Sequence, residues 1–160
     1  MKHARIWLTI GICGLITAAG SIAPLRAQST ANLFLSGASY LTTVHNSQGT
    51  VASRGVITLH TGGTMSVIDS GQGGPLFFSS QLGSWAPDGK GGLVARTIDF
   101  DYPPNAAVAR LDYAIKFSTT TPGQITGTIT LTTFPLTANP LDGGGTVVGT
   151  FTFTGQLIKP

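Results

Sequence analysis

Arg96, Trp85 and Tyr113 are the residues whose types and spacing offer the most chemistry. A guanidinium is always charged and offers five donors to a carboxylate, a phosphate or a carbonyl. An indole and a phenol beside it supply apolar surface and one further polar group each. The trio therefore predicts one of two things: an internal ligand-recognition point, or a guanidinium that stacks on the indole and binds nothing.

Two predicted hairpins bring this trio together on one apolar face. With a turn at residues 103–106, the arginine opposes Tyr113 across the hairpin. With a loop at residues 87–92, Trp85 opposes Val94 and lies diagonal to the same arginine. The interior of the predicted fold then contains one cation.

Three more residues join the candidate ligand-binding set. Phe100 and Tyr102 fall on or beside the predicted apolar face. His60 ends a short strand just before a glycine turn, which places it at the rim, where it could act as a general base or be an ordinary exposed histidine. No residue is predicted to be catalytic.

The Asp99-x-Asp101 pair is predicted to lie on the outside. Two carboxylates on one strand face suit a metal or an acid–base pair. The same turn places Arg110 opposite Asp99, however, so a solvated cross-strand ion pair is the better interpretation.

Metal, cofactor and nucleic-acid functions find no support in the sequence. The histidines at positions 45 and 60 have no metal-ligand spacing, and no phosphate loop or G-x-S-x-G motif is present. Lys plus Arg number 9 and Asp plus Glu 6, but the excess lies in the first 27 residues. The remaining chain is neutral, which argues against nucleic acid as a partner.

The first 27 residues predict a secretory signal peptide. Basic residues 1–5 precede the apolar run 6–19, which is too short to span a membrane, and Ala27 ends a small-residue stretch suited to cleavage. Residues 28–160 then form one domain without cysteine, exported to the periplasm or the medium and free of the membrane.

Alternating segments predict an all-β domain. Turn residues separate strands that we expect near 33–45, 54–60, 64–70, 76–86, 92–102, 107–118, 124–134 and 146–158. The last three alternate most clearly between an apolar and a polar face. Eight strands at this spacing predict an antiparallel meander barrel, with a β-sandwich as the alternative.

The segment 58–70, followed by Gly83-Ser84-Trp85, Gly91–Val94 and Ile98–Tyr102, resembles small exported bacterial barrels of the lipocalin-like (calycin) type. That resemblance implies a lumen that holds a small, mostly apolar molecule. Allene-oxide-cyclase-like and dirigent-like barrels share the architecture and would imply cyclase or coupling-guide chemistry.

Three functions remain open from the sequence. The first is non-catalytic binding of a small apolar or amphipathic ligand in the lumen. The second is a cofactor-free isomerase or cyclase that acts on a hydrophobic substrate, and the third is a structural β-domain with a filled interior. The sequence also leaves a homo-oligomer open.

Overall fold

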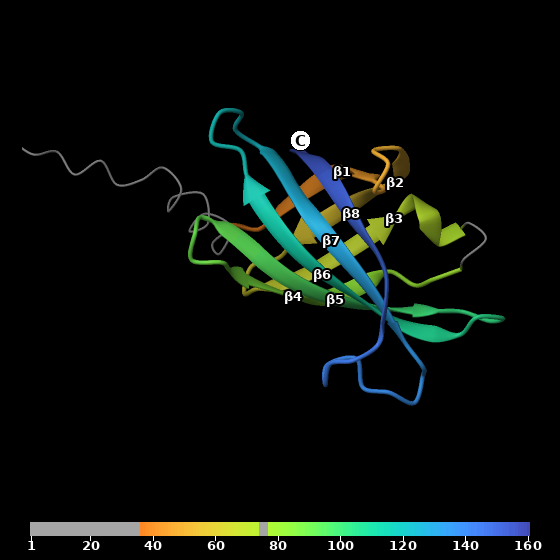
Figure 1. Ribbon diagram of the computed structural model, residues 1–160. Coiled ribbons are helices and arrows are strands. Elements are labelled where there is room, and N and C mark those ends of the chain that lie inside the picture. Colours follow the sequence, from red (N-terminus) through yellow and green to blue (C-terminus); the bar gives the residue numbers. More distant parts are fainter. Residues whose placement is uncertain (1–35, 74–76) are drawn as a thin grey trace, which may run out of the picture.

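The computed structural model describes residues 36–73 and 77–160, so the predicted signal peptide and its cleavage site lie outside the described residues. The elements are β1 (Ala38–His45), β2 (Val51–Leu59), β3 (Thr64–Asp69), the 3-10 helix η1 (Ser70–Gly73), β4 (Gln81–Pro87), β5 (Gly92–Asp101), β6 (Ala107–Phe117), β7 (Gln124–Phe134) and β8 (Thr146–Leu157). Each strand pairs antiparallel with the next, and β1 also pairs with β8. The predicted meander barrel is confirmed, and the sandwich alternative is wrong. Figure 1 shows the strands in this order around the barrel.

Alternation of side chains decides which face of each strand is buried. On β6, Leu111, Tyr113 and Ile115 are buried, whereas the alternate residues Ala114 and Lys116 are exposed. The same alternation holds along most of β7 and β8, where threonines cover much of the outside. Threonine suits this position because it favours extended backbone without requiring burial.

Glycine and aspartate shape the turns at one end of the barrel. Gly62 and Gly63 have φ values of 83° and 87° between β2 and β3, a conformation that side chains disfavour. Between β4 and β5, an Asp88 carboxylate oxygen accepts hydrogen bonds from the backbone N–H groups of Lys90 and Gly92. These bonds hold the pKa of Asp88 below its usual value.

Strand β5 lies one residue away from the predicted register. Trp85 pairs with Ala95 rather than with Val94, and Tyr113 also pairs with Ala95 rather than with Arg96. Because side chains alternate, this shift turns the whole of β5 over relative to its neighbours. The predicted inward position of Arg96 is therefore wrong.

The shift comes from the two connections that flank β5. Pairing with β4 continues to Pro87–Leu93, so the loop is shorter than the predicted 87–92. Pairing with β6 stops at Asp101–Ala107, so the turn is longer than the predicted 103–106. Loop length fixes hairpin register, and each difference changes the pairing by one residue, so that both neighbouring strands meet β5 with its two faces exchanged.

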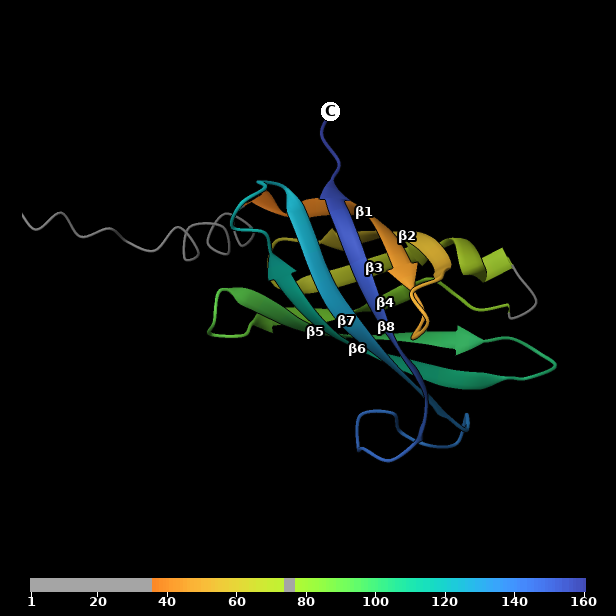
Figure 2. The same cartoon turned by 45° about the horizontal axis from the view of Figure 1, so that its top comes forward.

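The core occupies mainly one end of the barrel, near the β2–β3, β4–β5 and β6–β7 turns. Large side chains that pack there are Leu59, Met65, Trp85, Leu93, Ile115, Ile125 and Phe153. Figure 2 shows β7 and β8 passing in front of β1–β4, so that two walls face each other across this core. The other end of the barrel, near η1 and the β5–β6 turn, is less filled.

Candidate functional site

A cavity of about 530 Å³ occupies the less filled end of the barrel. We call it the lumen cavity. Its apolar wall comes from strands all around the barrel: Val44, Ile57, Val67, Ala109, Leu111, Ile129, Leu131, Val148 and Phe151. Gly71 of η1 and Phe78 border it from the β3–β4 connection. The volume lies within the range typical of sites for small molecules.

A hydrogen-bonded polar group forms part of the cavity wall. The Tyr113 hydroxyl donates to Gln81 Oε1 at 2.6 Å, and the Thr97 hydroxyl donates to the same oxygen at 3.0 Å. All three side chains are buried. Burial raises the pKa of Tyr113, so this phenol stays protonated and acts as a donor.

Three carboxyl groups also line the lumen cavity: Asp69 of β3 and Asp99 and Asp101 of β5. Asp99 is 3% exposed, and its Oδ1 is the one buried side-chain polar atom in residues 36–73 and 77–160 that has no hydrogen-bond partner. Burial, with smaller contributions from the charges of Asp101 and Asp69, raises the pKa of Asp99 to about 7. Burial also raises the pKa of Asp101.

These carboxyl positions correct the sequence-based prediction. Asp99 was expected on the outside opposite Arg110, but it pairs with Ala109 and faces the lumen. Arg110 instead binds Asp112 Oδ2 at 3.0 Å and the Pro140 carbonyl at 2.7 Å. The predicted Asp99–Arg110 ion pair is therefore wrong, because the β5 shift separates the two faces.

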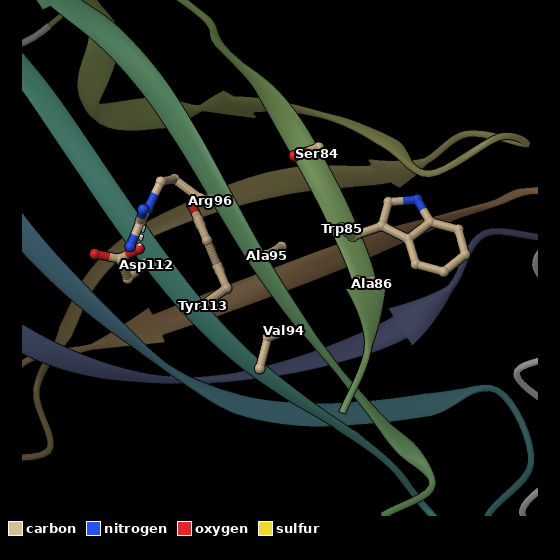
Figure 3. Close-up of a pocket in the computed structure, with 8 residues that line it drawn as sticks. All are labelled: Ser84, Trp85, Ala86, Val94, Ala95, Arg96, Asp112 and Tyr113. Atoms are coloured by element: carbon tan, nitrogen blue, oxygen red, sulfur yellow. Dashed lines mark hydrogen bonds and ion pairs between the residues drawn. The ribbon is translucent and has the colours of Figure 1, made fainter. Parts of the chain in front are cut away.

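Arg96 lies on the outer surface of the barrel. Its Nε is 2.6 Å from Asp112 Oδ1, and its side chain is 47% exposed. Figure 3 shows the guanidinium beside this carboxylate and the indole of Trp85 extending in the opposite direction. A hollow of about 480 Å³ here is open to solvent. All three members of the predicted trio border this outer hollow, but the Trp85 and Tyr113 side chains are buried, whereas the Arg96 guanidinium lies outside the lumen.

The other two members of the trio point inward but differ in their surroundings. Trp85 is buried in the packed end of the barrel, where its Nε1 donates to the His60 carbonyl at 3.2 Å. Tyr113 lies between the packed end and the lumen cavity. Its ring packs edge-on against the ring of Phe153, with 6.3 Å between the two ring centroids. Of the six candidate residues, only Tyr113 lines the lumen cavity.

The remaining candidates lie at the surface. Phe100 is 51% exposed because it lies on the outer face of β5, and Tyr102, directly after the end of β5, is also 51% exposed. The His60 side chain is exposed at the packed end, where its Nε2 lies 3.0 Å from the Ser66 hydroxyl. These residues are not brought together with Tyr113.

Gln81 is a functional candidate that sequence reasoning missed, and Asp99 is one that it considered but assigned to the outer face. The available signal was the odd-numbered series of β5, in which Leu93, Ala95 and Thr97 lead to Asp99. Within the described ranges, no group of three or more His, Cys, Asp or Glu side chains has an arrangement that could hold a metal ion. In those same ranges, no helix is long and apolar enough to cross a membrane.

Comparison with known proteins gives no relative: no family model, curated protein or solved structure matches this chain.

Proposed function

We propose that this protein binds a small apolar or amphipathic molecule in the lumen cavity and does not act on it chemically. One observation carries the proposal: a cavity of about 530 Å³ with a mainly aliphatic wall remains inside a closed barrel. Apolar side chains that line a cavity open to water lack packing contacts on that side and stay hydrated, which is unfavourable. A ligand that fills the cavity would restore those contacts.

The two alternative functions have less support. A purely structural barrel would fill its interior, and here the packing is confined mainly to one end. A cofactor-free isomerase or cyclase needs polar groups that converge on the substrate. Arg96 lies outside, and the Tyr113 hydroxyl is already engaged by Gln81, so neither group converges with Asp99 on a substrate in the cavity.

The resemblance to exported calycin-type barrels supports the same proposal. We also propose, from the sequence alone, that residues 1–27 direct export and that the barrel works in the periplasm or the medium. An exported binding protein would meet its ligand outside the cytoplasm.

A fluorescence titration tests the binding proposal. N-phenyl-1-naphthylamine, a neutral apolar fluorophore, should brighten on entering the lumen cavity of the wild-type protein. Leu131→Trp adds bulk to a side chain that lines this cavity and should abolish the signal. Leu82→Trp is the matched control, because Leu82 is 67% exposed on the outer face of β4.

Circular dichroism and thermal melts of both variants establish that each is folded. Loss of the signal in Leu131→Trp with retention in Leu82→Trp supports binding in the lumen. No binding to the folded wild type, or equal binding by all three proteins, rejects it.

A further inference from the structure

The charged side chains that line the lumen cavity are all acidic. Its lining includes Asp69, Asp99 and Asp101, and no Lys, Arg or His among the described residues that line it. In a cavity with low-dielectric walls, such charges act strongly on a bound molecule. An anionic ligand would be repelled there, whereas a cationic group would be attracted.

Asp99 is the carboxyl group best placed to receive that cation. Asp69 is already engaged, because its Oδ2 accepts from the Ser53 hydroxyl at 2.8 Å and its Oδ1 from the Gly71 backbone N–H at 2.7 Å. Asp101 lies at the end of β5 and is partly exposed. Asp99 is buried, lines the cavity and has an oxygen without a partner.

We propose that the ligand is an amphipathic amine, whose protonated nitrogen is bound by Asp99 while its apolar chain fills the aliphatic part of the lumen cavity. This inference rests on the proposed binding function and specifies the ligand class. An ammonium group supplies the donors and the positive charge that a buried carboxylate lacks. The aliphatic wall accounts for the rest of the molecule.

Protonation of Asp99 makes the predicted recognition depend on pH. The titratable groups that share the cavity with it are Asp101 on the same strand, Asp69 of β3 and Tyr113 of β6. None of them carries a positive charge that could pair with the Asp99 carboxylate. A bound ammonium would lower the pKa of Asp99 from about 7, so amine affinity should fall as the solution is acidified below that value.

Three ligands with alkyl chains of the same length distinguish the contribution of the ligand's charge to affinity from that of its apolar burial. Decylamine, decan-1-ol and decanoate are each used to displace N-phenyl-1-naphthylamine from the full chain, first at about pH 8, where alkyl amines are protonated. We expect decylamine to bind about tenfold more tightly than decan-1-ol, since a charge-assisted hydrogen bond is added, and decanoate to bind most weakly. Acidification to about pH 5 should remove most of the preference for the amine.

Asp99→Asn keeps the shape of the side chain and removes its charge. In this variant the affinity for decylamine should fall about tenfold, to that for decan-1-ol. Asp142→Asn is the matched control, because Asp142 lies exposed in the β7–β8 loop, and it should keep the wild-type preference.

The outcomes distinguish this inference from the function on which it rests. If decan-1-ol binds wild type as tightly as decylamine, the amine proposal fails and lumen binding stands. If the preference survives in folded Asp99→Asn, Asp99 is not the recognition group and the inference is overturned. If neither the fluorophore nor any decyl compound binds wild type, both proposals fail.

Discussion

Burial of the Asp99 carboxyl group is energetically unfavourable, and no contact within the described part of the barrel compensates for it. Its Oδ1 has no partner, and its nearest charged neighbours, Asp101 and Asp69, are of the same sign. A buried carboxyl in such surroundings keeps its proton to higher pH. A buried titratable group that lines a cavity and has an oxygen without a partner is a candidate for a functional site, which is why Asp99 is the centre of the proposed site.

Stability should depend on pH through Asp99. Its pKa is about 7 in the folded chain, against an ordinary value of 3.8, so the folded state holds more protons between these values. The free energy of unfolding should therefore decrease as pH rises from about 4 to 7, by up to ~1.4 kcal/mol per pH unit. Urea unfolding at a series of pH values measures this slope.

Asp99→Asn should flatten that slope and raise stability at neutral pH, because no buried charge then forms. A smaller slope should remain, since burial also raises the pKa of Asp101. Asp142→Asn, in an exposed loop, should leave the wild-type slope intact. Superimposable profiles for wild type and Asp99→Asn would show that Asp99 titrates normally in the folded protein.

Arg96→Ala provides a test of the outer face. Arg96 forms an ion pair with Asp112 at the surface, and such pairs contribute only ~0–1 kcal/mol. We expect the melting temperature to change little and the affinity for N-phenyl-1-naphthylamine not to change. A large loss of affinity with an intact fold would place this guanidinium at the binding site after all.

At the scale of single elements, β5 shows where sequence reasoning succeeded and where it failed. Its limits, and those of β6, β7 and β8, lie close to the predicted segments, because glycine, proline and aspartate end each strand. The prediction of which face of β5 points into the barrel was wrong. The even positions Val94, Ile98 and Phe100 are the more apolar, yet they face outward, because pairing with β4 and β6 fixes the register.

A close approach between β4 and β5 depends on Gly83. A Cβ at this position would lie only 1.9 Å from the Arg96 carbonyl oxygen, which is a backbone atom and cannot move aside easily. We predict that Gly83→Ala destabilises the barrel by ~1–3 kcal/mol or more, because the two strands must separate.

Gly149→Ala is the comparison for that substitution. A Cβ at Gly149 would meet only the Phe151 ring at 3.4 Å, an ordinary contact, so the change should stay within about 0.5 kcal/mol. Urea unfolding of the two variants gives the comparison. Equal stabilities would mean that β4 and β5 are not packed as closely as the structure shows.

At the scale of the whole molecule, the barrel is packed at one end and hollow at the other. The sequence predicted closure into a barrel, because eight alternating segments at short intervals leave few other folds. The position of the cavity could not be predicted in the same way. It depends on which side chains meet across the lumen, and a one-residue shift in β5 exchanged Arg96 for Asp99 on the inner face.

The most direct measurement of the central claim is an amide ¹H–¹⁵N correlation spectrum recorded while the barrel is titrated with N-phenyl-1-naphthylamine. If the lumen cavity is the binding site, shifts should be largest for residues that line it, such as Asp99, Leu111 and Leu131, and small for Leu93 and Ile125 in the packed end. Shifts confined to the outer face around Arg96 and Leu82, or a spectrum that does not change, would contradict the account.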